Sequence, residues 1–151
     1  MVNFTKYLGI DYGSKRVGIA VSDENKKYSF SRDFIINDSK FFGNLIKVII
    51  EEKIEKIVIG YPLNFKSEKT IQTEAVEKFR SELESRLKRN NIDAEIVYFD
   101  ERLTSKIAQE SILNSGLSRK KRQEKGRVDS ISAQIILQDF IDKTNNQNIY
   151  I

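Results

Sequence analysis

The sequence predicts an α/β protein built on a mixed five-stranded sheet, with the element order βββαβαβαα and helices on both faces. Two patterns lead to this prediction. Apolar residues alternate with a period of two near the beginning of the chain. Further along, amphipathic stretches with a period of about 3.6 residues are separated by short apolar runs. Strands separated by helices are expected to be parallel with right-handed crossovers, whereas strands joined by short links pair antiparallel.

Three strands are predicted first, over residues 5–12, 16–23 and about 28–36. In the second strand, Val17, Ile19 and Val21 alternate with the smaller residues Gly18, Ala20 and Ser22, a period of two that is typical of a strand. A tight turn at Gly13-Ser14 joins the first two strands, and a polar turn over 23–27 leads to the third. These short links predict an antiparallel meander.

The period then changes to that of a helix over about residues 40–53, with Asp38 or Ser39 as its cap. The buried stripe of this helix is predicted to contain Phe42, Leu45, Ile46, Ile49 and Ile50. A short apolar run at 56–61 indicates a buried fourth strand, which Pro62 ends. Residues 63–69 are expected to form a loop.

A long helix is predicted over about 70–89, with a stripe of Ile71, Ala75, Phe79, Leu83 and Leu87, and a fifth strand over 95–99. Thr104 is expected to cap a helix over about 105–115, which Gly116 stops. The last helix is predicted over about 128–142, with a stripe of Val128, Ile131, Ile135, Ile136 and Phe140. All 151 residues fit a single domain, in which 145–151 are expected to form a loosely ordered tail.

Composition restricts the chemistry. The chain has no cysteine and no histidine, so disulfides, thiolate nucleophiles and serine–histidine–aspartate triads are excluded. No apolar run approaches the roughly 18 residues that a membrane-spanning helix needs, and the first residues do not resemble a secretory leader. We therefore expect a cytoplasmic protein without a membrane partner, whose metal-binding side chains are aspartate and glutamate.

Three acidic signatures lie where predicted strands end or helices begin: Asp11, the pair Asp100-Glu101, and Asp129. The carboxyl ends of neighbouring parallel strands meet at one edge of a sheet, so these carboxylates are expected to gather there. Hard oxygen ligands of this kind suit Mg²⁺ or Mn²⁺. Local explanations also exist, because Asp100 could act only as a cap and Asp129 could act only on a helix dipole. An acid after the apolar residues of a central strand, as at Asp11, is harder to explain locally.

A basic segment precedes the third acid. Residues 118–127 (SRKKRQEKGR) contain six basic side chains and one acid, and the rest of the chain carries a net charge of −1. A localised cluster of this kind is typical of proteins that bind phosphate backbones, although a solvated charge run without a partner is the alternative.

Four segments together resemble the pre-16S rRNA nuclease family, which is also described as Holliday-junction-resolvase-like. They are LGIDYGSKRVGIAVSD (8–23), IVIGYPLN (57–64), DERLTS (100–105) and DSISAQIILQDF (129–140). The resemblance implies an RNase H-like fold and a metal-dependent nuclease that trims the 5′ side of the small-subunit ribosomal RNA precursor. It also implies that Asp11, Glu101 and Asp129 are the catalytic and metal-binding residues. Alternation along a strand allows only one of Asp100 and Glu101 to face the site easily, and the resemblance selects Glu101.

The chain departs from related nucleases at two places. Many RNase H-like nucleases carry an acid at the end of the fourth strand, where this chain has Tyr61-Pro62-Leu63-Asn64. The loop after Asn64 reads FKSEKT and lacks the glycine that the family usually has there. Asn64 could supply a carbonyl ligand or a phosphate contact. The side chains expected to bind nucleic acid are Lys15, Arg16, Arg102, Arg119, Lys120, Lys121, Arg122 and Arg127.

Three other functions compete with an RNA nuclease. A resolvase of branched DNA would need a symmetric dimer, and the sequence indicates only a monomer or a weak homodimer. A nucleic-acid-binding module without catalysis fits the missing acid on the fourth strand. A sugar-kinase-like ATPase is suggested by DYGSKRVGIAV (11–21), but such enzymes need two domains, for which 151 residues are too few.

Overall fold

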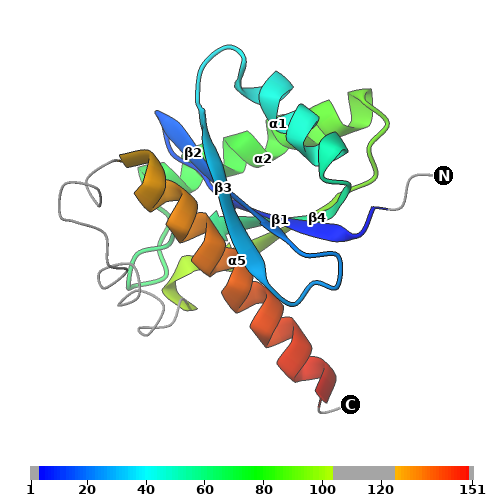
Figure 1. Ribbon diagram of the computed structural model, residues 1–151. Coiled ribbons are helices and arrows are strands. Elements are labelled where there is room, and N and C mark those ends of the chain that lie inside the picture. Colours follow the sequence, from blue (N-terminus) through cyan, green and yellow to red (C-terminus); the bar gives the residue numbers. More distant parts are fainter. Residues whose placement is uncertain (1–3, 104–124, 150–151) are drawn as a thin grey trace.

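The computed structural model describes the backbone of residues 4–103 and 125–149 and the side chains of residues 4–102 and 130–146. Five strands form one mixed sheet in the order β3-β2-β1-β4-β5 (Figure 1), which confirms the predicted α/β class. The strands are β1 (Lys6–Asp11), β2 (Arg16–Ser22), β3 (Ser29–Ile36), β4 (Ile54–Tyr61) and β5 (Glu95–Asp100). The helices are α1 (Phe41–Glu51), α2 (Ile71–Arg89), the 3₁₀ turn η1 (Glu101–Leu103) and α5 (Lys125–Ile149).

The central strand β1 joins the two halves of the sheet. It pairs antiparallel with β2, and β2 pairs antiparallel with β3, so the predicted meander is confirmed. On its other side, β1 runs parallel to β4, and β4 runs parallel to β5. The carboxyl ends of β1, β4 and β5 therefore lie at one edge, which is where the first two acidic signatures were expected to meet.

Helices α1 and α2 cover one face of the sheet. The two helices contribute Phe41, Leu45, Ile49, Val76, Phe79 and Leu83 to a core that also contains Leu8, Ile10, Ile19, Ile57 and Ile59 from the strands. Aromatic rings concentrate near the carboxyl end of β1. Phe79 lies there with its ring centroid 4.5 Å from that of Tyr12 in a stacked arrangement, and 5.8 Å from that of Phe41.

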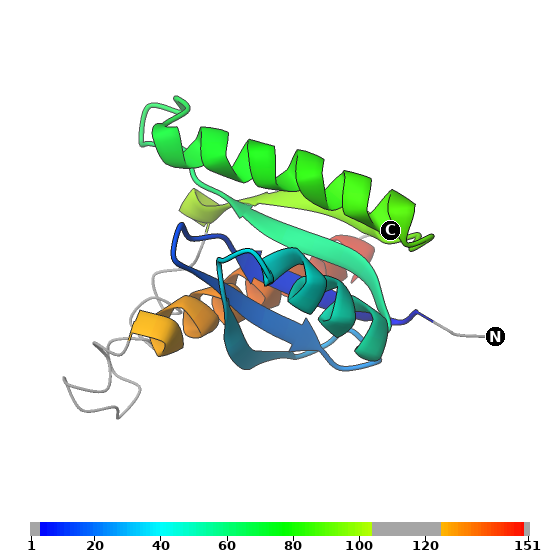
Figure 2. The same cartoon turned by 90° about the horizontal axis from the view of Figure 1, so that it is seen from above.

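Helix α5 packs on the opposite face, as Figures 1 and 2 show. Gly9 permits a close approach, because a Cβ atom at this position would lie 2.7 Å from Leu137 Cβ and 2.9 Å from the Ala133 carbonyl oxygen. Gln138 accepts a hydrogen bond from the Ser29 amide (2.8 Å), and Gln134 donates to the Ser29 carbonyl (3.1 Å). Helix α5 is thus fixed to both the centre and the β3 edge of the sheet.

The predicted elements on the described residues agree with the structure, but several details differ. Lys40 is the N-cap of α1 and makes no side-chain cap bond, whereas the Asp38 carboxylate accepts from the Lys40 amide in the turn before the helix. Helix α5 runs from Lys125 to Ile149, so residues 145–149 continue the helix instead of forming a loose tail. The predicted helix over 105–115 lies outside the described residues. Among the described helices, none combines the length and the apolar character needed to cross a membrane.

The predicted helical stripes are confirmed at Leu45, Ile46 and Ile49 in α1 and at Phe79, Leu83 and Leu87 in α2, and they are wrong at one end of each. In α1, Phe41 is buried and Ile50 is 50% exposed, and in α2, Thr73 and Val76 are buried whereas Ile71 is 88% exposed. The contacts of the first turn of α2 explain the difference there. Thr70 forms a capping box with Thr73, and the Thr73 hydroxyl donates to the Pro62 carbonyl, so this face of the first turn packs against the chain leaving β4.

Candidate active site

Asp11 ends the central strand and is followed by a turn that several side chains hold in place. The side-chain amide of Asn37 donates to the Gly13 carbonyl (2.9 Å) and to the Tyr12 hydroxyl (3.1 Å). Gln72, from the first turn of α2, donates to the Tyr12 carbonyl (2.7 Å). With Tyr12 stacked in the core, the backbone immediately after Asp11 is fixed from three directions. Sequence reasoning did not identify Asn37 or Gln72, because neither lies in an acidic or basic motif.

The neighbouring acids Asp100 and Glu101 have different environments. Asp100 is the last residue of β5 and lies opposite Tyr61 in the parallel ladder. Glu101 begins the 3₁₀ turn η1, so the chain changes direction between the two carboxylates. Asp100 binds the guanidinium of Arg102, whereas Glu101 points across β4. The sequence led us to expect that only one of these two acids faces the site easily, and Glu101 is the one that hydrogen-bonds with Asp11.

Glu101 lies over Gly60 and reaches Asp11. A Cβ atom at Gly60 would collide with the Glu101 carboxyl group and would lie 2.9 Å from Ile136 Cδ1, so a larger residue here would displace the Glu101 side chain from its present position. Burial raises the pKa of the Glu101 carboxyl above its usual value, a hydrogen bond with the Asp11 side chain opposes the rise, and the charge of Asp100 adds to it. Two carboxyl groups that share a hydrogen bond require a proton between them. The structure thus places an acid pair at the carboxyl edge of the sheet.

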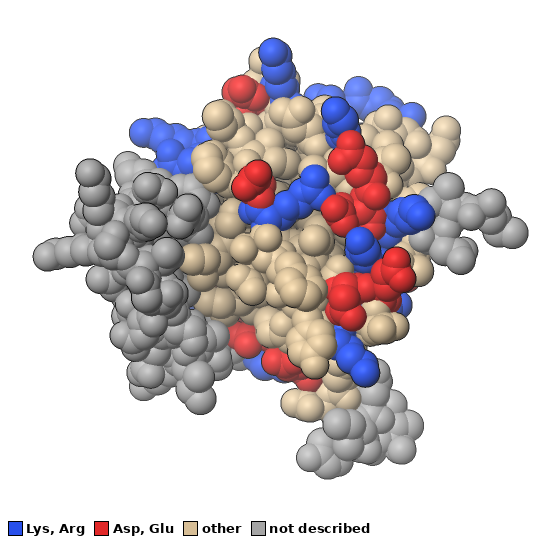
Figure 3. Space-filling view, in the orientation of Figure 1, with Lys and Arg blue, Asp and Glu red and all other residues tan. Residues whose placement is uncertain are grey.

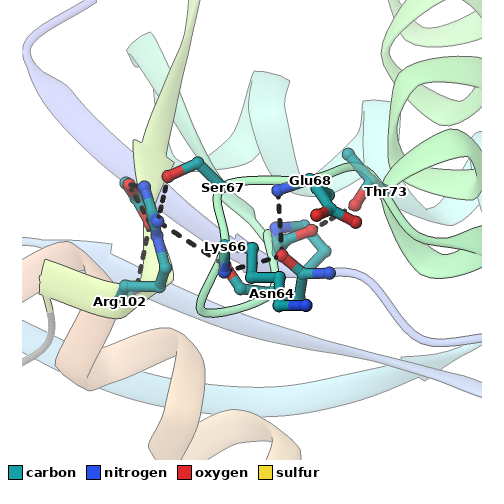
Figure 4. A network of polar contacts seen from close by, with 8 residues as sticks. Asn64, Lys66, Ser67, Glu68, Thr73 and Arg102 are labelled. Carbon is teal, nitrogen blue, oxygen red and sulfur yellow. Dashed lines mark hydrogen bonds and ion pairs between the residues drawn. The ribbon is translucent and has the colours of Figure 1, made fainter.

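Arg102 connects η1 to the loop after β4. Its Nε donates to both oxygens of Asp100 (3.0 and 3.1 Å), and its Nη1 donates to the Ser67 hydroxyl (2.7 Å), as Figure 4 shows. The Arg102 guanidinium holds the pKa of the Asp100 carboxyl below its usual value, and Asp100 raises the pKa of Arg102 in return. Arg102 was expected to bind nucleic acid, but its guanidinium is held by contacts within the protein.

Asn64 organises the loop over residues 64–69. Its side-chain oxygen accepts from the backbone amides of Lys66 and Glu68, both at 2.9 Å (Figure 4). The backbone amide of Asn64 donates to the Glu68 carbonyl at 3.2 Å. The sequence suggested Asn64 as a carbonyl ligand of a metal or as a phosphate contact, and its side-chain carbonyl oxygen accepts the hydrogen bonds from Lys66 and Glu68 instead. This loop reaches its tight conformation without glycine, because Ser67 adopts a positive φ of 64°.

Asp129 lies near the start of α5, and its side chain is outside the described set. Ile136, which reaches the Gly60–Glu101 contact, follows Asp129 by seven residues, so the two positions share one side of the helix about 10 Å apart along its axis. Figures 1 and 2 both place the first turn of α5 at the same end of the sheet as η1. The N-terminal end of α5 is therefore the end that lies toward the Asp11–Glu101 pair.

The donor set of this edge fits a divalent cation. Asp11 and Glu101 supply hard oxygen ligands, and a cation between them would replace the shared proton and remove the cost of two adjacent negative charges. Within residues 4–102 and 130–146, no group of three or more His, Cys, Asp or Glu side chains is close enough to hold a metal ion. A third carboxylate would have to come from another residue, such as Asp129.

The structure describes the side chains of only some of the basic residues that were expected to bind nucleic acid. Lys15 is exposed in the turn after Asp11, where its carbonyl oxygen accepts from the Asn37 amide, and Arg16 begins β2 beside it. Arg119, Lys120, Lys121 and Arg122 lie outside the described residues, and Arg127 is described only as part of the α5 backbone. On the face seen in Figure 3, the described lysines and arginines are interspersed with acids.

Comparison with known proteins agrees with this geometry. The model of the RuvX family, described as a Holliday junction resolvase, matches residues 5–143. The chain belongs to the RuvX family. A RuvX relative from Sulfurihydrogenibium sp., named "Putative pre-16S rRNA nuclease", is 38% identical over 95% of this chain and 94% of its own. A protein of the same name from Flavobacterium psychrophilum is 38% identical over 91% of this chain and 97% of its own.

Solved structures of low sequence identity share the RuvX fold. The T. thermophilus RuvC structure in complex with a Holliday junction substrate has a TM-score of 0.57 at 6% identity and covers 92% of this chain and 96% of RuvC. A second T. thermophilus RuvC structure gives a TM-score of 0.51 with the same coverage. This likeness confirms the RNase H-like fold that the sequence motifs implied.

Proposed function

We propose that this RuvX protein is a divalent-metal-dependent nuclease that processes the 5′ end of pre-16S ribosomal RNA in the cytoplasm. The observation that carries the proposal is the half-buried, hydrogen-bonded carboxyl pair of Asp11 and Glu101 at the carboxyl edge of the sheet. The names of the relatives support the substrate, and the RNase H-like fold supports cleavage of a phosphodiester bond. We assign catalytic and metal-binding roles to Asp11, Glu101 and Asp129.

The acid pair is prepared for metal binding by its surroundings. Asp11 is held rigidly by the turn after it, and Glu101 is directed over Gly60 by η1. Mg²⁺ or Mn²⁺ held by Asp11 and Glu101, with Asp129 as the third carboxylate, would supply an activated water and stabilise the negative charge of the leaving oxygen. Because the two carboxyl groups share a proton, the pair must release it before both carboxylates can bind a cation.

Basic side chains would hold the substrate near this pair. Lys15 and Arg16 follow Asp11 by four and five residues, at the turn between β1 and β2, and would contact a phosphate next to the scissile bond. The basic residues of 118–127 add a phosphate-binding segment that precedes Asp129 in the sequence. Each phosphate neutralised by these residues releases counterions, so RNA binding should weaken steeply with salt. Replacing Arg119, Lys120, Lys121 and Arg122 with alanine should reduce that salt dependence.

A cleavage assay tests the proposal. Purified protein is offered a precursor ribosomal RNA fragment and a four-way DNA junction, each with Mg²⁺, with Mn²⁺ and with a chelator. We expect metal-dependent cleavage of the RNA that is lost in Asp11→Asn and in Glu101→Gln. Asp33→Asn, an acid-to-amide change at an exposed residue of the edge strand β3, is the matched control and should cleave normally.

The outcomes separate the competing functions. Preferential cleavage of the DNA junction would favour a resolvase, which the description of the RuvX family supports. Binding of RNA without cleavage of either substrate would favour a binding module. Normal cleavage by Asp11→Asn would refute the role of the acid pair.

A further inference from the structure

Phe65 is an aromatic residue that the fold displays at the edge of the sheet where the acid pair lies. Its exposed fraction is 101%, the highest among the large apolar side chains that the structure describes as exposed. It lies in the loop that follows β4, the strand between the one ending in Asp11 and the one ending in Asp100. The core therefore gains nothing from this ring.

The loop that carries Phe65 is rigid. Asn64 accepts from the amides of Lys66 and Glu68, the Ser67 amide donates to the Asn64 carbonyl (3.0 Å), and Leu63 pairs with Lys69 in an antiparallel bridge. From outside the loop, Arg102 donates to the Ser67 hydroxyl (2.7 Å) while it is bound to Asp100 (Figure 4). The loop is therefore braced against η1, the turn that directs Glu101.

A rigid, exposed aromatic ring beside a phosphodiester-cleaving site suits one ligand chemistry in particular. Every nucleobase has a flat face that can stack on an aromatic ring, and the ring then loses little conformational freedom because its backbone is already fixed. Paired bases inside a duplex are covered by their neighbours, so only an unpaired base offers a free face. The adjacent Lys66, which is exposed, adds a cation for the backbone phosphate.

We propose that Phe65 is a stacking platform for an unpaired base next to the cleaved bond, and that Asp100 and Arg102 act as positioning residues that hold it in register with Glu101. This proposal rests on the proposed nuclease function and deepens it. It assigns the substrate class as a strand that is single-stranded at the site, in contrast to a continuous duplex. The expectation from sequence that Arg102 itself binds nucleic acid is replaced by an indirect role.

The test measures stacking separately from cleavage. A short single-stranded RNA carrying 2-aminopurine is titrated with the Asp11→Asn protein, which keeps the RNA intact, and fluorescence quenching reports stacking. We expect Phe65→Ala to remove the quenching and to weaken binding about 5- to 150-fold, the range that corresponds to losing one base–aromatic stack. Phe65→Trp should retain both. The control is Tyr28→Ala, which removes a ring that is 63% exposed before β3, at the end of the sheet away from Asp11.

Further measurements test which nucleic acid binds and whether the contacts of Arg102 hold the loop that carries Phe65. The same RNA annealed to its complement, and the equivalent DNA strand, show whether an unpaired base is required and whether the sugar matters. Arg102→Ala should reduce quenching with the Phe65 ring still present, and Arg102→Lys should restore it only in part, because lysine lacks the planar fork that binds Asp100 and Ser67 together. Melting temperatures of all variants verify that each is folded.

The platform is refuted if Phe65→Ala binds and quenches as its parent does, if no single-stranded oligonucleotide binds, or if Tyr28→Ala causes an equal loss. These outcomes differ from failure of the nuclease proposal. Quenching that depends on Phe65, without cleavage by the parent protein, would support the platform and reject the nuclease. Cleavage that is lost in Asp11→Asn but unaffected in Phe65→Ala would support the nuclease and reject the platform.

Discussion

Gly60→Ala tests the position of Glu101 directly. A Cβ atom at residue 60 would collide with the Glu101 carboxyl group and would lie 2.9 Å from Ile136 Cδ1, closer than real Cβ atoms approach other atoms. Overpacking of this kind costs about 1–3 kcal/mol of folding free energy. In a domain of this size, each kcal/mol lowers the melting temperature by roughly 2–4 °C, so we expect a decrease of about 2–12 °C.

Gly43→Ala is the matched control. A Cβ atom at Gly43, within α1, meets nothing within 4 Å, so the alanine side chain fits without strain. Because alanine favours helix over glycine, this variant should gain about 0.5–1 kcal/mol of stability. The two glycine-to-alanine variants should therefore move the urea midpoint in opposite directions.

The same substitution should damage the site beyond its effect on stability. Displacing Glu101 from Asp11 by about 1 Å is expected to reduce cleavage roughly 100-fold at a temperature where the variant is fully folded. In the Glu101→Ala background the carboxyl group is absent and only the Ile136 contact remains, so Gly60→Ala should destabilise less there than in the parent. Equal costs in both backgrounds, or unimpaired cleavage, would show that Glu101 does not lie over Gly60.

Three further predictions follow from the same structure. Burial raises the pKa of Glu101, so the contribution of its protonated form to stability is fully present below the unfolded value near 4.5 and is lost as pH rises through the folded pKa. Without divalent ions, the parent should therefore lose stability relative to Glu101→Gln as the pH rises above about 4.5, as followed by urea unfolding at several pH values. Mn²⁺ or Mg²⁺ at about 100 times its Kd should stabilise the parent by about 2.7 kcal/mol and Asp11→Asn by much less, and equal thermal shifts in the two proteins would argue against this site. Phe79→Ala, which removes the ring stacked on Tyr12, should cost about 3–5 kcal/mol in chemical unfolding, whereas a loss below 1 kcal/mol would mean that this aromatic cluster is not part of the core.

Hydrophobic periodicity was sufficient to predict most of the fold. Alternation in β2 and the apolar runs of β4 and β5 reflect burial within the sheet, which a single sequence records directly. The burial of residues in the first turn of α2 was less predictable. It depends on the contact of Thr73 with the Pro62 carbonyl, a tertiary interaction that leaves the apolar Ile71 exposed. The length of α5 was underestimated because its last turns are polar.

The candidate site was only partly predictable for the same reason. Strand order alone brings Asp11 and the Asp100-Glu101 pair to one edge, and the acids could be identified from their position after apolar runs. Asp100 binds Arg102 and Glu101 hydrogen-bonds with Asp11 because the 3₁₀ turn after β5 redirects the chain, and no periodicity in the sequence indicates this turn. The roles of Gly60, Asn37 and Gln72 arise from contacts between residues far apart in the sequence, so a local pattern could not reveal them.

The single helix that covers the second face of the described sheet has a consequence for how this protein is made. A ribosome delivers all five strands before it delivers α5, whose residues begin at Lys125. Until then, Ala20, Val58 and Phe99 have no contact with the helix that buries them, and the amide and carbonyl of Ser29 have not met the two glutamines of α5. Between the synthesis of Asp100 and that of α5, the nascent chain therefore has a sheet with one uncovered apolar face. Association of this exposed face with another unfinished chain is the hazard at that stage, and a chaperone that binds the face would prevent it.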